Sequence, residues 1–254
     1  MTDLIAKATD RAQSADLAPL SALLEEVCIN RGMDTQRHGK YLLAVNMNGA
    51  DQMFWGCTGA SNGKTGFIIA RDPAWYRPVL QARGIPVPHT FRAPMRSPDS
   101  IRKYLEELGE SASMWWRDRP RSVRQVSAQT LNLSWKKFLE LQPSEESTQI
   151  VLEPAQLGPE SSILVAFGKV LDAPDEVPED AKQLAIRAVA ALPGCKVAEV
   201  VLVHPPEHGY QVREVSPNLN NWNVLPYREK SGELVTAALE GHTQFHAAQL
   251  QRAA

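Results

Sequence analysis

The chain has 254 residues, 43% of them hydrophobic, and its 27 basic and 29 acidic side chains nearly balance. This length and composition allow a sizeable buried core, which excludes a disordered chain. The net charge of −2 provides no global field that would attract nucleic acid. No apolar run reaches the length of a membrane span, and the N-terminus lacks a signal-peptide hydrophobic region. We therefore expect a cytoplasmic protein that does not enter a membrane.

The cysteines indicate a reducing compartment. Cys28, Cys57 and Cys195 are an odd number of thiols at wide spacings, and none belongs to a CxxC pair. The sequence therefore predicts reduced thiols, with neither a zinc site nor a disulfide framework.

The first half of the chain predicts helices joined by turns, with one β-hairpin. Over residues 4–31 apolar residues recur at intervals of three and four, which is typical of an amphipathic helix, expected to begin near Ala18-Pro19 and to end at Gly32. Two apolar runs, 41–47 and 53–55, flank an Asn-Gly turn and predict a hairpin. Further helices are predicted over residues 72–83, 101–108 and 134–141, with an extended proline-rich segment at 85–88.

The second half predicts strands paired by turns, with helices between them. Strand-like runs cover residues 150–152 and 163–167, and a Gly-Lys turn leads the second run into a hairpin. The other predicted elements are a helix at 181–192, a buried strand at 197–203, its antiparallel partner at 210–215 and a last helix at 234–251. This arrangement indicates α+β architecture and not a doubly wound parallel sheet.

Three segments carry motifs in an informative order. Residues 70–88 join an Ala-Arg-Asp-Pro start to a Gly-Ile-Pro-Val-Pro end. Residues 150–170 contain Ile-Val-Leu-Glu-Pro, Gly-Pro-Glu and a hairpin, and residues 197–218 end in Arg-Glu-Val-Ser-Pro-Asn. In this order the segments resemble the nucleotide-lobe entry, the adenine hinge and the metal-binding strands of ATP-grasp ligases. That superfamily includes cyanophycin synthetase, glutathione synthetase and ribosomal-protein glutamate ligases.

The resemblance implies an α+β, ATP-grasp-like two-lobed fold with a short N-terminal helical region. The predicted domains are an N-terminal helical and hairpin region over residues 1–68, the N-terminal lobe over 69–149, and the C-terminal lobe with its terminal helix over 150–254. A hinge is expected near residues 150–160, with the cleft between an arginine-rich segment, 117–124, and Glu214.

The same resemblance implies an ATP-dependent carboxylate–amine ligase, which activates a carboxylate as an acyl phosphate that an amine then displaces. Its cofactors would be ATP and Mg²⁺, and its substrate an amino acid or peptide. A ligase partner subunit and a homo-oligomer are compatible with it, and no nucleic-acid partner is expected. The positions that match are Arg117 and Glu214 for catalysis, Arg117, Leu152, Glu153, Glu160 and Lys169 for the cofactor, and Glu214, Ser216 and Asn218 for the metal.

Several positions depart from the family pattern and weaken this chemistry. Pro73 and Ser162 stand where a lysine and an arginine would meet phosphates, and Val201 stands where a metal-binding carboxylate is expected. The glycine-rich flap is replaced by an Arg-Asp-Arg-Pro-Arg segment at 117–121, which lacks the backbone freedom of glycine. We expect weak or lost activity, and a non-catalytic peptide-binding module or a partner subunit of an active ligase remain alternatives. Any retained anion recognition is expected in the segment 117–124.

Three smaller patterns have competing interpretations. The stretch at 59–65 resembles a phosphate loop, but its first glycine is displaced by one position, so a P-loop NTPase is the less favoured hypothesis. His242 and His246 are spaced to share a metal, yet surface histidines are the favoured interpretation. Trp115 and Trp116 are expected to pack in a core and not to form a stacking platform.

Overall fold

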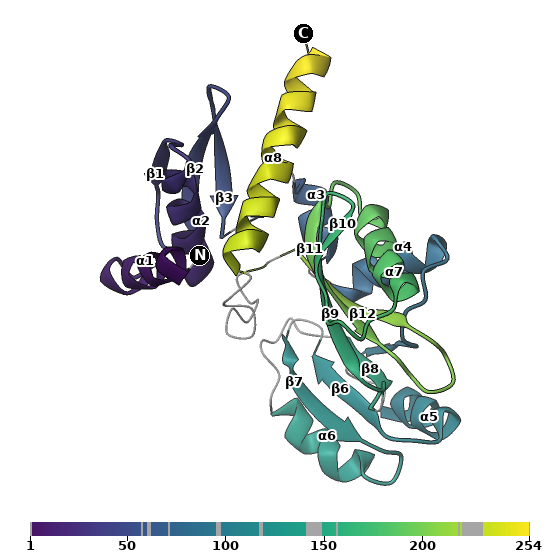
Figure 1. Ribbon diagram of the computed structural model, residues 1–254. Coiled ribbons are helices and arrows are strands. Elements are labelled where there is room, and N and C mark those ends of the chain that lie inside the picture. The colour runs from purple at the N-terminus through teal and green to yellow at the C-terminus, as the bar shows by residue number, and fades with distance from the viewer. Residues whose placement is uncertain are drawn as a thin grey trace. The chain divides into compact units, whose positions relative to one another are not determined.

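The computed structural model describes residues 2–56, 58–59, 62–70, 72–94, 98–116, 119–140, 149–155, 157–217, 219 and 231–253 (Figure 1). Helices and strands are mixed along this part of the chain, which confirms the predicted α+β class. The helices are α1 (Thr2–Ser14), α2 (Pro19–Asn30), α3 (Lys64–Ala70), α4 (Pro73–Ala82), α5 (Pro98–Leu108), α6 (Leu131–Leu139), α7 (Glu179–Ala191) and α8 (Ser231–Ala253).

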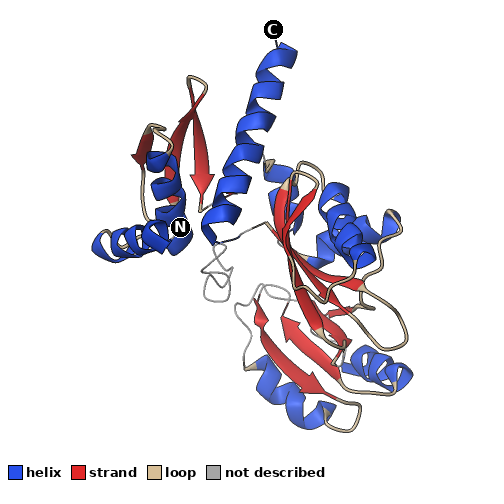
Figure 2. Ribbon diagram, in the orientation of Figure 1, coloured by secondary structure: helices blue, strands red, loops and turns tan. Residues whose placement is uncertain are grey.

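The described strands form three four-stranded sheets, which Figure 2 shows in red. The first has the order β1-β2-β3-β4, with β1 (Thr35–Arg37), β2 (Leu42–Met47), β3 (Ala50–Trp55) and β4 (Thr58–Gly59). The second has the order β5-β8-β6-β7, with β5 (Phe91–Pro94), β6 (Ala112–Trp116), β7 (Arg119–Val126) and β8 (Gln149–Pro154). The third has the order β10-β9-β11-β12, with β9 (Glu160–Ala166), β10 (Lys169–Asp172), β11 (Val197–Val203) and β12 (Gln211–Ser216).

Contacts between residues divide the chain into two compact units. Unit 1 comprises Met1–Ile85, Ser161–Leu202 and Glu214–Ala254, and unit 2 comprises Pro86–Glu160 and Val203–Arg213. Both units are discontinuous in sequence, whereas the predicted domains are consecutive segments. The boundaries expected after residues 68 and 149 therefore stay a prediction.

The helix expected to begin near Ala18-Pro19 is confirmed as α2, and a second helix, α1, precedes it and was not predicted. Asp16 has a left-handed backbone with φ of 46°, and Pro19 is the first residue of α2, where its missing N–H does no harm. The predicted hairpin is confirmed, since β2 and β3 pair around Asn48 and Gly49, which have φ of 54° and 82°. Both turn residues adopt the left-handed conformation that asparagine and glycine tolerate best.

The core of unit 1 joins the first and third sheets through α2 and α8. Its buried apolar side chains come from segments far apart in sequence, including Leu24, Val27, Met47, Phe54, Leu164, Val197 and Leu239. No described helix is long and apolar enough to cross a membrane.

Unit 2 packs α5 and α6 against its sheet (Figure 2). Ile101 of α5 and Phe138 of α6 are fully buried with Met114 of β6. Strands β5, β6 and β7 were not predicted from the sequence. Arginines interrupt the apolar alternation of β7, and β6 pairs with β8, which follows it by more than thirty residues, so no local pattern marks this sheet.

The glycine-rich stretch before α3 packs against the turn that precedes β11. The side-chain oxygen of Asn62 accepts hydrogen bonds from the N–H groups of Lys196 at 2.7 Å and Val197 at 2.9 Å. Its amide nitrogen donates to the Val197 carbonyl at 2.7 Å. A Cβ on Gly66 would lie 2.3 Å from the carbonyl oxygen of Pro193, so only glycine allows this close approach.

Replacing Gly66 with alanine is expected to destabilise the protein by about 2 kcal/mol, because the methyl group would push apart two backbone segments. Urea denaturation measures this change in the free energy of unfolding. The matched control is Gly63→Ala, whose Cβ would lie 3.6 Å from Cα of Gly194, an ordinary contact. The control should lose less than about 1 kcal/mol. Equal losses in the two variants would contradict the close-packing explanation.

Candidate functional site

The loop between β8 and β9, which the sequence predicts as the hinge, is held by backbone contacts. Gly158 has φ of +77°, and a Cβ there would lie 2.2 Å from the carbonyl oxygen of His204. The His204 N–H donates to the carbonyl of Pro159 at 3.1 Å. Glycine is therefore required at position 158 both by conformation and by space. The hinge acids Glu153 and Glu160 stand on either side of this loop.

Arg213 of β12 forms ion pairs with both hinge acids. Its Nη2 lies 3.2 Å from Oε1 of Glu153, and its Nη1 contacts Oε1 of Glu160. Glu153 is only 2% exposed, so its charge requires a nearby cation. The side chain of Glu160 is 52% exposed, so its pairing with Arg213 is partly screened by solvent.

The role of Arg213 was not predicted from the sequence. The residue belongs to the motif at 213–218 that resembles the metal-binding strands, and nothing in that motif indicates a function for its side chain. Arg213 pairs with Glu160 across 53 positions of sequence, and a single arginine on a strand does not indicate such a partner. The two acids Glu153 and Glu160 near a glycine loop indicate that a cation is needed, but they do not indicate which residue provides it.

Leu152 lies in the core of unit 2. It is fully buried and faces Met114 of β6 and Phe91 of β5 across the sheet. Its side chain is therefore not available to a ligand, and its predicted cofactor role would depend on backbone atoms.

Lys169 begins β10 after the predicted hairpin turn in unit 1. The turn residues Phe167 and Gly168 have φ of 51° and 78°, and Lys169 pairs with Ala166 of β9. The lysine side chain is exposed, which leaves it accessible to an anion.

The two strands expected to bind metal are β11 and β12. On β12, Glu214 is exposed and Ser216 is half-buried. On β11, Val201 provides no ligand, and the half-buried Glu199 accepts a hydrogen bond from the Ser162 hydroxyl. Magnesium prefers carboxylate, phosphate and water oxygens in octahedral geometry.

The described donors on these strands therefore fit magnesium poorly. Glu214 contributes one carboxylate, and that of Glu199 already accepts from the Ser162 hydroxyl. The hydroxyl of Ser216 is a weaker ligand than the asparagine of the family pattern that Ser216 replaces. Within the described residues, no group of three or more His, Cys, Asp or Glu side chains could hold a metal ion.

Two predicted site residues, Arg117 and Asn218, lie outside the described residues, as does residue 118. The strands on either side, β6 and β7, pair with Trp116 opposite Arg119. Trp115 is 5% exposed, as expected for core packing. The anion-binding role of the segment 117–124 stays a prediction.

The elements at the two ends of the stretch 59–65 differ from those around a phosphate loop. Strand β4 has two residues and is antiparallel to β3, and α3 has only seven residues. A phosphate loop connects a buried strand of a parallel sheet to a long helix. The described residues at either end therefore favour a packing role for the glycines, and the P-loop NTPase stays the less favoured hypothesis.

His242 lies in the core, so the interpretation as a surface histidine is wrong. It is 4% exposed, and its Nε2 accepts a hydrogen bond from the Gly59 N–H at 3.3 Å. Phe54 and Phe167 pack edge-on against the imidazole, with ring centroids at 5.1 and 4.9 Å. Burial lowers the pKa of His242 to about 4. The neutral ring serves packing, which a four-residue spacing of histidines does not reveal.

Of three comparisons with known proteins, the one with solved structures finds similar proteins. No protein-family model matches the chain, and no curated protein matches it. A bifunctional glutathione synthetase from Pasteurella multocida is 13% identical over 89% of this chain and 44% of its own, with a TM-score of 0.61. The D-alanine-D-alanine ligase from Coxiella burnetii is 18% identical over 74% of this chain and 61% of its own, with a TM-score of 0.60.

A third similar structure is that of the ATP-grasp ligase PsnB complexed with minimal precursor, Mg and ADP. It is 16% identical over 72% of this chain and 62% of its own, with a TM-score of 0.57. The chain spans less than two thirds of the length of each of these three structures. At such identities the likeness concerns the fold.

Removal of the Arg213 guanidinium is expected to lower the free energy of unfolding by about 3 kcal/mol, because Glu153 would lose a cation that pairs with its buried charge. Arg213→Met keeps much of the side-chain volume, and urea denaturation at pH 7 measures the loss. Glu160→Gln is the control, since it weakens only the exposed pair and should cost less than about 1 kcal/mol. A loss in Arg213→Met no greater than the control's would show that Glu153 does not depend on this arginine.

The buried His242 should make stability fall in acid. Its folded-state pKa of about 4 lies below the ordinary value of 6.5, so the unfolded chain binds the proton first as pH falls. The contribution of the neutral His242 to the free energy of unfolding is fully present above pH 6.5. It declines toward pH 4, by about 3 kcal/mol in total. His242→Gln should flatten this part of the plot of unfolding free energy against pH, whereas His208→Gln at an exposed loop should not. A profile unchanged by His242→Gln would argue against a neutral buried imidazole.

Proposed function

Because the chain has the ATP-grasp fold, we propose that it is a relative of the ATP-dependent carboxylate–amine ligases in which nucleotide and magnesium binding are weakened. Its retained role is the binding of an amino-acid or peptide ligand. Were a nucleotide bound, Arg117, Leu152, Glu153, Glu160 and Lys169 would be its contacts, and Glu214, Ser216 and Asn218 would be the magnesium ligands. ATP would supply the phosphoryl group that activates a carboxylate.

The observation that carries this proposal is the pairing of both hinge acids with Arg213. Glu160 is the residue that would accept hydrogen bonds from a ribose, and a hydroxyl would have to compete there with a guanidinium. A charge-assisted pair is stronger than a neutral hydrogen bond. The ribose contact is therefore weakened by an interaction inside the protein.

The phosphate contacts are weakened because neutral residues stand where the family pattern has cations. Asp72 caps α4 by accepting from the Ala74 N–H at 2.8 Å, and Pro73 begins that helix where a lysine would be needed. Ser162 supplies no charge and donates to Glu199. With Val201, these replacements forgo charge-assisted contacts worth about 1.5 to 3 kcal/mol each.

A partner subunit of an active ligase is a second candidate, favoured by exposed apolar side chains on unit 1. Ile68 of α3 and Trp75 of α4 are 51% and 55% exposed. These two helices contact each other, so both side chains belong to one helical pair. Large exposed apolar side chains on neighbouring elements are typical of protein interfaces.

Calorimetric titration with ATP and magnesium is expected to give no measurable heat or a high dissociation constant. The double variant Ser162→Arg with Val201→Asp restores one phosphate cation and one metal carboxylate, and should tighten binding at least tenfold, which corresponds to about 1.4 kcal/mol. Ser161→Arg adds the same charge at the neighbouring position and is the control. Wild-type binding tighter than about 10 μM would contradict the proposal.

Release of phosphate from ATP, screened against pairs of amino acids, separates a binding protein from an enzyme. We expect no substrate-dependent release by the natural chain. Release that depends on an amino-acid pair and is abolished by Glu214→Ala would instead establish ligase activity, because that carboxylate is the best of the described metal ligands.

A further inference from the structure

A groove of about 600 Å³ lies between α1, α2 and β1 in unit 1. Its charged walls are Lys7, Asp10 and Arg11 from α1, Glu26 from α2 and Arg37 from β1. Ile29 of α2 adds an apolar wall that is 44% exposed. The groove therefore offers cations, anions and an apolar surface within the space of a small molecule.

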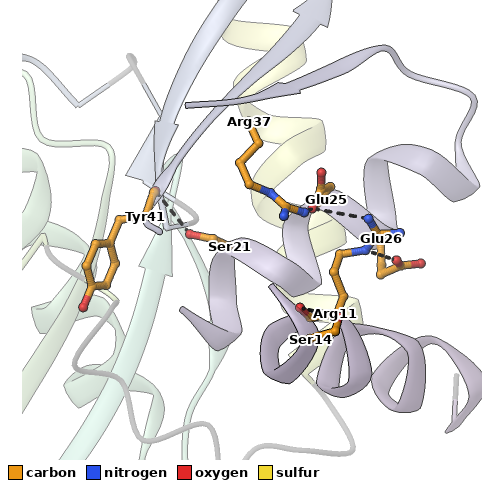
Figure 3. A network of polar contacts seen from close by, with 7 residues as sticks. All are labelled: Arg11, Ser14, Ser21, Glu25, Glu26, Arg37 and Tyr41. Atoms are coloured by element: carbon orange, nitrogen blue, oxygen red, sulfur yellow. Dashed lines mark hydrogen bonds and ion pairs between the residues drawn. The ribbon is translucent and has the colours of Figure 1, made fainter. Parts of the chain in front are cut away.

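Two buried acids hold the two arginines of this groove (Figure 3). Glu25 and Glu26 are 7% and 5% exposed. Nη2 of Arg37 contacts Oε2 of Glu25, Nε of Arg11 contacts Oε1 of Glu26, and Nη1 of Arg11 lies 3.7 Å from Oε2 of Glu25. The four side chains form a row of alternating charges in the order Arg37, Glu25, Arg11, Glu26, which joins β1, α2 and α1.

This row orients the guanidinium groups before any ligand arrives. Each guanidinium carries five N–H donors in one plane, more than the contacts to Glu25 and Glu26 use. The side chains of Arg11 and Arg37 are 34% and 28% exposed, so part of each reaches solvent at the groove. Arginines fixed by buried acids lose little further freedom on binding a carboxylate, which favours such binding.

The signs of the wall charges indicate the kind of ligand. The cations Lys7, Arg11 and Arg37 line a groove that also contains the carboxylates of Asp10 and Glu26, and Lys7 pairs with Asp3 at 2.7 Å. A phosphate dianion would be attracted by the cations but repelled by the carboxylates, and a simple amine would meet the reverse, so neither ligand matches both signs. A molecule with one carboxylate and one ammonium group matches both signs.

We propose that this groove binds a free α-amino acid with an apolar side chain. The ligand carboxylate accepts from Arg11 and Arg37, its ammonium donates to Asp10 and Glu26, and its side chain lies against Ile29. The inference rests on the proposed function because it gives the retained amino-acid binding a location. It requires neither ATP nor magnesium.

Titration of the full chain with L-leucine tests the proposal, followed by NMR of the arginine side-chain Nε–Hε signals. We expect saturable shifts of the signals of Arg11 and Arg37. Leucinamide, which lacks the carboxylate, and N-acetyl-leucine, which lacks the ammonium, should each bind at least tenfold more weakly, a loss of about 1.4 kcal/mol. Absence of saturable shifts, or equal binding of either analogue, would overturn the proposal.

Substitutions of groove residues provide a second test of L-leucine binding. Arg37→Lys keeps the charge but removes the planar fork, and Asp10→Asn leaves both buried pairs intact because Asp10 is exposed on α1. Arg37→Lys should weaken L-leucine binding about tenfold, and Asp10→Asn about threefold because its pair with the ammonium is exposed. Lys103→Gln removes an exposed lysine of an i,i+4 pair in unit 2 and should change nothing. If Asp10→Asn binds as the natural chain does, the ammonium is not held there and the zwitterion assignment is wrong.

The two hypotheses fail in different experiments. Weak ATP binding together with no L-leucine binding would overturn the groove and leave the weakened nucleotide site in place. Tight ATP binding with L-leucine shifts at Arg11 and Arg37 would overturn the weakened nucleotide site and leave the groove.

Discussion

Buried carboxylates that must be paired with arginines organise both units of this protein. In unit 2, Arg213 neutralises Glu153, which is 2% exposed. In unit 1, Arg11 from α1 meets Glu25 and Glu26 of α2, both less than a tenth exposed. An isolated charge at such depth costs several kcal/mol. Once the backbone buries the acid, the position of its arginine is tightly constrained, and the elements that carry the two are held together.

This constraint connects stability to the proposed loss of chemistry. A ligase would present its polar groups to a nucleotide, yet here two of the positions proposed for that role serve the protein itself. Ser162 donates to Glu199, and Glu160 pairs with Arg213. Each of these contacts stabilises the fold by satisfying a polar group, and each makes that group less available to a ligand. A fold can therefore be retained while its chemistry weakens.

Much of the local structure could be predicted because short-range physics decides it. The Asn-Gly turn at residues 48–49 forms the predicted hairpin, since both residues accept positive φ. Helix α4 begins at Pro73 after its capping Asp72, and the chain turns at Gly84 with φ of +68°. The order of three motifs also indicated the fold, although no single motif did so.

The sequence by itself determined the α+β class, most helices and the strands of the second half, because periodicity and turn residues act over a few positions. Only the tertiary structure decided the sheet of unit 2, the burial of His242 and the partners of the acidic residues. Strand β6 pairs with β8, and Arg213 reaches Glu160 across 53 positions. Such partners come together only when the chain folds. The spacing of residues along the sequence does not indicate which distant groups will be buried side by side.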